Sequence, residues 1–411
     1  MEGNAMLLYI GIDIDKDDTM LSFFHEGMEE PETVSTVIGS EHFRIKTVLS
    51  KRKGMGQWYF GEDGKEKEAA GIAVPVPELY ESALNNKRVT VDGEIYSARE
   101  LFLIFMKKIL SLPGRSCMNA PEKKITFTLD HIGREEIELF QYVGNALSLD
   151  KDRINLTDRR ESFYYYALSQ EESLYLRDVL LLDYDGSRMF SVLLSRNENT
   201  TPQVVNLVKT NLNAPRLDRD NEFLRILENI LQGKAISSVY LIGEGFDGDW
   251  MKESIGYLCK NRRVFMGKNL YSKGACYAGY IKDGKQEWPF VFIGDNELKM
   301  NVSLKVSDKN KMKFITLCTA GDSWFDAKGE CECILDGEPE IAVWIQKPDS
   351  REASMKVFTL TDIPERENRT TRVRINAIPE SDKDIRIEIK DLGFGEIVTS
   401  SNKSWTYRLS C

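Results

Sequence analysis

Apolar and polar positions follow the same order at two places along the chain. At each place an apolar run ends in Asp-x-Asp, and a short polar turn leads into a second apolar run; the copies cover residues 7–24 and 179–194. Apolar runs bounded by Asp, Gly and Ser are typical of β-hairpins. The pattern therefore predicts two hairpins with paired acids at their tips, which are either metal or phosphate sites or solvated turns. The paired acids are Asp13 and Asp15 in the first hairpin, and Asp183 and Asp185 in the second.

The segments after each hairpin also repeat. Capping boxes at Ser97 to Glu100 and at Asp158 to Glu161 mark two helix starts. Two successive units of this kind predict an α/β protein with two mixed sheets and a ligand cleft beyond the strand ends, between the halves. The first unit has expected strands at 42–49, 57–60, 125–129 and 154–156 and helices at 97–109, 134–147 and 158–168; the second has strands at 203–208 and 238–242 and helices at 220–231, 249–259 and 270–281.

The pattern changes at about Phe290, where helical spacing gives way to short alternating strands. Turn residues separate these strands, and their spacing is typical of a β-sandwich. The C-terminal third is therefore predicted to be all-β. Its expected strands cover residues 300–306, 313–318, 330–335, 341–346, 357–360, 372–377 and 385–389.

Length and charge narrow the function classes. A chain of 411 residues, of which 42% are hydrophobic, is long enough for two or three domains. Its net charge of -10 argues against nucleic acid as a partner, because phosphate binding needs clustered Lys and Arg on one face. No apolar run approaches the roughly 20 residues that cross a bilayer, so no membrane association is expected. These features predict a cytoplasmic protein.

Cysteine and histidine do not indicate a metal centre. The 7 cysteines are scattered along the chain, and their odd number argues against a disulfide framework. The 3 histidines, at positions 25, 42 and 131, complete no pattern that is typical of zinc binding or of a Cys-His pair. A zinc site is therefore not predicted.

Four short motifs resemble those of the superfamily that contains sugar kinases, heat-shock chaperones and actin. Residues 11–15 resemble its first phosphate motif, and residues 182–187 resemble its second. Residues 241–246 resemble its adenosine motif, and residues 273–278 resemble the helix that follows. Glu161 matches the glutamate that opens the helix joining the two lobes in heat-shock chaperones of the DnaK type.

The resemblance covers nearly the whole chain, because residues 357–364, 371–375 and 384–395 are similar to the late strands of the DnaK substrate-binding sandwich. It implies a duplicated, actin-like (ribonuclease H-like) two-lobed ATPase fold followed by an antiparallel β-sandwich. The implied domains are a first lobe at 1–170, a second lobe with a shortened insertion at 171–285, and a sandwich without a helical lid at 286–411.

The resemblance also implies roles for particular residues. Asp13 and Asp183 would hold a magnesium ion through water, and Glu161 would be the catalytic residue if the protein is an ATPase. The positions that match nucleotide-binding residues are Asp13, Asp15, Asp183, Asp185, Gly186, Gly243, Glu244 and Gly245.

Both phosphate loops depart from the family pattern. The second loop has Asp185 at a glycine position, so that only Gly186 permits close backbone approach. Two like charges about 4 Å apart repel by roughly 4 kcal/mol at an effective dielectric constant of 20, so several aspartates would oppose a triphosphate unless a cation lies between them. Where the family's first loop has glycine and small hydroxyl residues, this chain has Asp15, Lys16, Asp17 and Asp18.

These departures leave three functions open. The first, which the lost phosphate donors favour, is a scaffold or a protein- or peptide-binding module that needs no cofactor and acts through the sandwich. The second is a protein that binds ATP or ADP with Mg²⁺, hydrolyses ATP slowly and has chaperone-like activity. The third is an actin-like assembly subunit.

Overall fold

The computed structural model describes residues 7–37, 40–113, 122–309, 311–350 and 352–410. The chain forms two compact units, and the first comprises Met1–Leu194 and Leu207–Trp288. The second unit comprises Ser195–Asn206 and Pro289–Cys411. Among the described residues, no helix combines the length and the apolar character that a membrane crossing requires.

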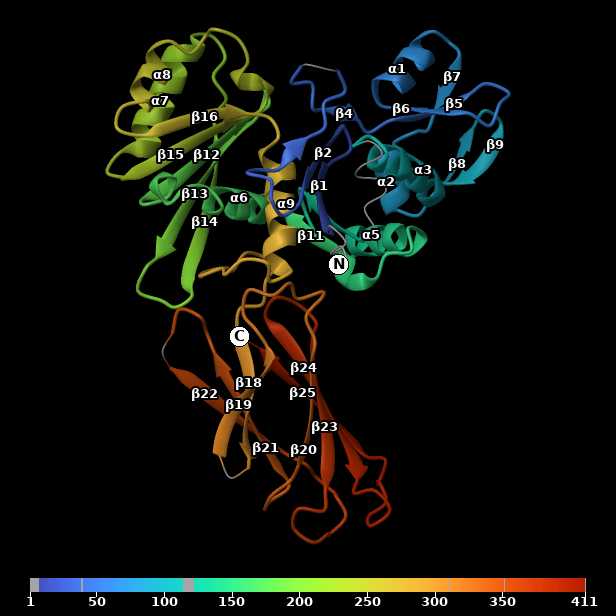
Figure 1. The fold of residues 1–411 in the computed structure, drawn as a ribbon, viewed down its shortest axis with the longest axis vertical. Helices are drawn as coiled ribbons and strands as arrows, with labels where there is room; N and C mark the ends of the chain where they lie inside the picture. The colour runs from blue at the N-terminus through green and yellow to red at the C-terminus, as the bar shows by residue number, and fades with distance from the viewer. Residues whose placement is uncertain (1–6, 38–39, 114–121, 310, 351, 411) are drawn as a thin grey trace, which may run out of the picture. The chain divides into compact units, whose positions relative to one another are not determined.

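The first unit is built on two mixed sheets that share one strand order (Figure 1). In each sheet, the first strand of the hairpin pairs antiparallel with the second strand of the hairpin. On its other side, the first strand pairs parallel with a strand from later in the chain. A fourth strand pairs parallel with that later strand. Both predicted hairpins are therefore confirmed. The first sheet has the order β11 (Ile154–Asp158), β10 (Glu122–Leu129), β1 (Leu7–Ile14), β2 (Asp18–Phe24) and β3 (Glu32–Thr33), with β4 (Ile45–Lys46) also paired to β2; the second has β16 (Arg263–Gly267), β15 (Ile236–Ile242), β12 (Asp178–Tyr184), β13 (Met189–Asn197) and β14 (Gln203–Leu212).

The helices of this unit begin and end close to the predicted positions, with two differences. The side chain of Ser97 makes no capping hydrogen bond, so the first predicted capping box is wrong although a helix begins there. Asp158 does cap its helix, because its carboxylate accepts a hydrogen bond from the Glu161 N–H at 2.8 Å. The helix expected at 249–259 is only six residues long. The helices are α3 (Ala98–Leu110), α5 (Arg134–Ala146), α6 (Arg159–Leu168), α7 (Arg219–Leu231), α8 (Glu253–Leu258) and α9 (Leu270–Lys282).

Helices α6 and α9 lie between the two sheets (Figure 1). A Cβ atom on Gly274 of α9 would come within 2.1 Å of the Ser162 carbonyl oxygen on α6, and one on Gly11 of β1 would come equally close, 2.1 Å, to the Ser272 carbonyl oxygen. Only glycine allows such close packing of backbone on backbone. These contacts fix the first turns of both helices relative to the end of β1.

Residues 45–97 add a small region that the sequence pattern largely missed. The strand predicted at 42–49 is present only in part, as β4 and the first residue of β5, whereas the strand predicted at 57–60 is confirmed as β6. Helix α1 is polar almost throughout, so no apolar periodicity could reveal it. The elements of this region are β5 (Leu49–Arg52), β6 (Trp58–Phe60), α1 (Gly61–Ala69), β7 (Ala73–Pro75), α2 (Leu79–Leu84), β8 (Arg88–Val91) and β9 (Glu94–Ser97).

The second unit contains two four-stranded antiparallel sheets that enclose one hydrophobic core. All seven predicted strands are confirmed, and an eighth, β25, was missed. Residues 203–205 of β14 also pair in parallel with β17 (Phe290–Phe292). In order across each sheet, the strands are β19 (Lys311–Cys318), β18 (Asn301–Asp308), β21 (Glu340–Gln346) and β22 (Ala353–Thr359), then β20 (Gly329–Ile334), β23 (Arg372–Pro379), β24 (Asp384–Gly393) and β25 (Ser404–Ser410).

The cysteines that the structure describes are all free thiols. Cys117 and Cys411 lie outside the described residues, so the expectation of scattered, unpaired cysteines is tested only for the other five.

Candidate functional site

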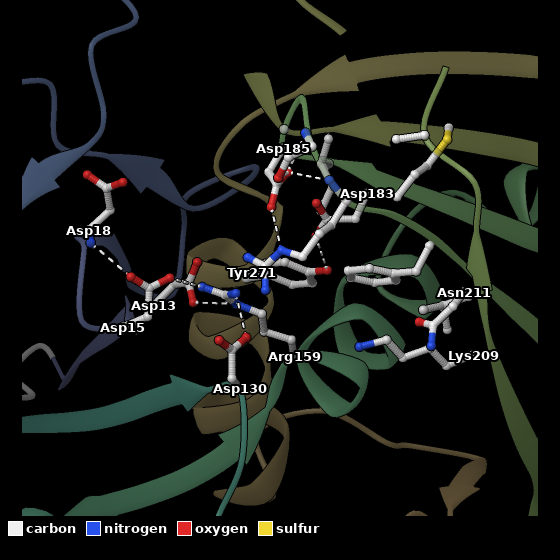
Figure 2. A pocket seen from close by; sticks show the side chains of 18 of the residues that line it. Asp13, Asp15, Asp18, Asp130, Arg159, Asp183, Asp185, Lys209, Asn211 and Tyr271 are labelled. Carbon is white, nitrogen blue, oxygen red and sulfur yellow. Dashed lines mark hydrogen bonds and ion pairs between the residues drawn. The ribbon is translucent and has the colours of Figure 1, made fainter. Parts of the chain in front are cut away.

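A cavity of about 890 Å³ lies in the first unit, beyond the carboxyl ends of the parallel strands (Figure 2). Such strand ends are where α/β sheets bind ligands. The structure brings together all four aspartates that the sequence singled out, because Asp13, Asp15, Asp183 and Asp185 all line this cavity.

The acids of the first hairpin tip are bound by Arg159, from the first turn of α6. Its guanidinium donates to Asp13 through Nε at 3.1 Å, to Asp15 through Nη2 at 2.8 Å and to Asp130 through Nη1 at 2.5 Å. Asp13 is only 2% exposed, so this ion pair is largely shielded from water. One arginine thus holds three carboxylates that end or follow two neighbouring strands, β1 and β10 (Figure 2).

Burial and Arg159 act in opposite directions on these carboxylates. Burial raises the pKa of Asp13 to about 6, although the positive charge of Arg159 lowers it. Burial alone would raise the pKa of Asp15, but Arg159 and the N–H groups of Asp18 and Asp17 together bring it below its usual value. Burial works against the charge of Arg159, but the carboxylates of Asp13 and Asp130 hold its pKa well above the usual value. The arginine therefore stays charged.

The second hairpin tip is held by a neutral partner. The Tyr271 hydroxyl, at the start of α9, donates to Asp183 at 3.0 Å. The Tyr271 ring lies beside Arg159, whose guanidinium carbon is 5.3 Å from the ring centre. Burial raises the pKa of Asp183, which the charge of Arg159 and the tyrosine hydrogen bond only partly offset. Tyr271 thus connects the acids of the two hairpins through Arg159.

Both tips use their own backbone donors. Asp15 Oδ1 accepts hydrogen bonds from the N–H groups of Asp17 at 2.8 Å and Asp18 at 2.9 Å. Asp185 Oδ1 accepts from the N–H groups of Ser187 at 2.8 Å and Arg188 at 2.7 Å. These are Asx-type turns, in which the side chain takes up the N–H groups of the following residues. The sequence predicted that acidic side chains replace the phosphate-binding donors, and the structure adds that two N–H groups of each turn are already bound.

Glu161 does not line the cavity. Its carboxylate is 3% exposed and pairs with Lys282 of α9, with 2.8 Å between Oε1 and Nζ. The capping turn at Asp158 points Glu161 toward α9 and leaves Arg159 facing the cavity. Glu161, which the resemblance predicted to be catalytic, therefore links α6 to α9. Arg159, two residues earlier, lies in the site instead.

Only one of the three predicted nucleotide-binding residues of the adenosine motif lines the cavity. Gly243 lines the cavity, whereas Gly245 lies beneath the Tyr184 ring, where a Cβ atom would come within 2.3 Å of a ring carbon. Glu244 is exposed and pairs with Arg44 at 3.1 Å. Gly245 and Glu244 are therefore not part of the cavity wall.

Gly186 occupies the tip of the second hairpin with φ of 95°, a left-handed conformation that favours glycine. It does not line the cavity either. Its role is therefore to form the turn.

Sequence reasoning missed Arg159, Asp130 and Tyr271. A signal was present for the acids, because Asp13, Asp130 and Asp158 end or follow neighbouring parallel strands, whose carboxyl ends meet at one sheet edge. No sequence signal indicated that the arginine rather than the glutamate of the α6 first turn would face them.

The two aspartates that the family resemblance assigns to magnesium already have partners in this cavity. Among the residues that the structure describes, no three His, Cys, Asp or Glu side chains are arranged to hold a metal ion. Asp13 already binds a guanidinium, and Asp183 accepts from a phenol.

Two family models together match nearly the whole chain. The model for the Domain of unknown function (DUF8552) matches residues 297–411. Among curated proteins, none is similar enough to this chain to count as a relative. The C-terminal model of the Family of unknown function (DUF5716) matches residues 30–295. This match covers more than half of the 411 residues, and the chain therefore belongs to the Family of unknown function (DUF5716).

Proposed function

We propose that the protein is a divergent, non-catalytic member of the superfamily of sugar kinases, heat-shock chaperones and actin, and that it serves as a scaffold or protein-binding module. The shared strand order of the two sheets and the packing of α6 and α9 between them support a duplicated, actin-like fold. The sandwich that follows supports the resemblance to DnaK-type chaperones in particular. Function still has to be argued from the site, because a shared fold does not carry it.

The observation that carries the non-catalytic assignment is the position of Arg159. Its guanidinium lies among Asp13, Asp15 and Asp130, where an ATPase of this fold would need a metal ion and phosphate oxygens. A triphosphate would have to displace Arg159 and release the N–H groups held by Asp15 and Asp185. It would then face several carboxylates at close range, which is strongly unfavourable.

An exposed apolar surface supports protein binding by the second unit. Met312 and Phe314 of β19 are 60% and 57% exposed, and Met355 and Val357 of β22 are 53% and 44% exposed. Trp344 of β21 lies between them, directly opposite Met355 and 5.8 Å from Phe314 between ring centres. We call these five residues the apolar sheet face. Exposed clusters of large apolar side chains on one face commonly mark binding sites for proteins.

The first experiment tests the cleft. Thermal unfolding is measured with and without millimolar ATP and Mg²⁺, and we expect the melting temperature to stay unchanged. A ligand at 100 times its dissociation constant would stabilise the protein by roughly 2.7 kcal/mol, which is readily seen. A shift that Asp183→Asn abolishes would contradict the proposal and support magnesium-dependent nucleotide binding.

The second experiment tests the sandwich. Fluorescence anisotropy measures the binding of a permanently unfolded, carboxymethylated protein to the full chain. We expect binding that the pair Phe314→Ser and Met355→Ser weakens at least about tenfold, because an apolar contact is lost at each position. Ile397→Ser is the matched control, since Ile397 is 77% exposed and lies outside the apolar sheet face. Equal binding by the pair and the control would exclude this face as the site.

A further inference from the structure

One wall of the cavity is made of hydrogen-bond donors. Lys209 and Asn211 alternate along β14, Asn213 follows at the next alternate position, and Arg216 lies shortly beyond. All four line the cavity. Alternate residues of a strand point to the same face, so an ammonium group and amide groups share one surface. We call these four residues the β14 wall.

The side-chain cations of the β14 wall make no ion pair with a described carboxylate, although the Glu222 carboxylate accepts a hydrogen bond from the Arg216 backbone N–H at 2.7 Å. Across the cavity, Arg159 pairs with Asp13 of the first hairpin tip, and Asp18 pairs with Lys46 at 2.7 Å. Within the described part of the chain, neither Lys209 nor Arg216 has a carboxylate within ion-pair distance. The cations of this wall are therefore open to a ligand, whereas those of the opposite wall are already used.

Lys209 is also held in place. Its Nζ lies 4.0 Å from the centre of the Phe190 ring, a cation–π contact with the neighbouring strand β13. Figure 2 shows this side chain beside Asn211, extending from β14 toward the middle of the cavity. A lysine fixed in this way loses less conformational freedom when it binds a ligand.

We propose that the β14 wall binds a small organic anion through a phosphoryl or carboxylate group. Lys209 and Arg216 contribute charge-assisted hydrogen bonds to the anion's oxygen atoms, and Asn211 and Asn213 contribute neutral ones. Phe190 is partly exposed, lines the cavity beside these donors and offers apolar surface to the carbon skeleton of the ligand. This site goes beyond the proposed scaffold function, because it uses neither hairpin tip and needs no metal ion.

The test uses pyrophosphate and citrate as probes, which separate the phosphoryl from the carboxylate source. Isothermal titration calorimetry at low salt measures binding of each anion to the full chain. We expect at least one to bind and the double variant Lys209→Gln with Arg216→Gln to weaken that binding at least about tenfold. Both side chains are exposed, so the double variant should keep its fold and its melting temperature.

Lys252→Gln is the matched control. It removes one positive charge from the same half of the unit at a position outside the cavity wall, and binding should stay within about twofold of the wild type. If neither anion binds at about 10 mM, or if the double variant binds as well as the wild type, the proposal is wrong.

The same variants separate this proposal from that of the non-catalytic cleft. ATP could raise the melting temperature of the wild type and of Asp183→Asn but not of the double variant. This result would locate the anion at the β14 wall. A shift that Asp183→Asn removes and the double variant preserves would locate the anion at the hairpin tips and would contradict the proposed function. The β14 wall would then be judged by the pyrophosphate and citrate titrations.

Discussion

The two hairpins have the same sequence pattern and the same turn, but their acids are held in different ways. In each, the second aspartate, Asp15 or Asp185, binds the N–H groups of its own turn. The first aspartate of each pair has a different partner: Asp13 binds the charged Arg159, and Asp183 binds the neutral hydroxyl of Tyr271.

This difference indicates how the cleft is stabilised. At the first tip, one internal cation binds three acids and offsets part of the repulsion among them. At the second tip, hydrogen bonds suffice because Asp185 is 40% exposed and pairs with Arg188 at 3.0 Å. The acids at the two tips are thus held by side chains and N–H groups of the chain itself.

Replacing Arg159 should have the largest effect. Arg159→Met would leave Asp13, which is 3% exposed at its side chain, without its charged partner. Removing one partner of a buried ion pair costs roughly 3–5 kcal/mol. Because the Arg159 side chain is 24% exposed, we expect about 3 kcal/mol or slightly less in urea unfolding.

Arg188→Met is the control for that experiment. Arg188 has the corresponding position near the second tip, but its side chain is 87% exposed. A surface ion pair contributes at most about 1 kcal/mol. If both variants lost the same amount of stability, the contrast between the two tips would be refuted.

Replacing Tyr271 should have a smaller effect. Tyr271→Phe removes the hydroxyl that donates to Asp183 and keeps the ring beside Arg159. A hydrogen bond to a charged group contributes about 1.5–3 kcal/mol, and we expect a loss near about 1.5 kcal/mol in the same assay. Tyr280→Phe, on the same helix, should cost less. A larger loss for Tyr280→Phe would show that the second tip does not depend on this hydroxyl.

The pH dependence of stability should distinguish the two tips further. Because the folded pKa of Asp13 is raised to about 6, above the usual 3.8, the folded state binds this proton more tightly than the unfolded state. Stability from this group therefore increases as the pH falls from about 6 to about 4, with a slope of at most about 1.4 kcal/mol per pH unit.

Asp13→Asn should remove that slope, as measured by urea unfolding at several pH values. Asp185 should behave in the opposite way, because burial is outweighed by the N–H groups of Arg188 and Ser187, which lower its pKa to about 2. Its contribution is present above pH 4 and is lost as the pH falls toward 2. An unchanged slope in Asp13→Asn would contradict the assignment.

The smallest effect is expected for the turn of the second hairpin. Asp185→Ala removes the acceptor for the N–H groups of Ser187 and Arg188, which can then bind water instead. We expect a loss of about 1 kcal/mol or less. Asp15→Ala should cost more, since it also removes a partner of Arg159. Equal losses would mean that the arginine adds little at the first tip.

Much of the fold could be predicted from the sequence, because its elements have strong periodic patterns. The hairpins, the helices α3, α5, α6, α7 and α9, and seven sandwich strands follow from apolar alternation or helical spacing. Helix α1 has no apolar face and therefore gave no signal, whereas β25 alternates Trp405, Tyr407 and Leu409 with polar residues, a strand pattern that was present but missed.

The site could be predicted only in part. The four aspartates at the hairpin tips were visible because they interrupt apolar runs. Either Arg159 or Glu161 could face these aspartates, depending on how the first turn of α6 is rotated about the helix axis. The cap at Asp158 sets that rotation. The β14 wall was also not apparent, since exposed Lys and Asn on a strand have the pattern of any solvated face.

The most direct test of the occupied cleft is a crystal structure of the protein soaked in ATP and Mg²⁺. We expect Arg159 to keep its contacts with Asp13 and Asp15, and both tips to keep their internal turn hydrogen bonds. Electron density for a phosphate between Asp15 and Asp185, with Arg159 displaced from the carboxylates, would contradict the account.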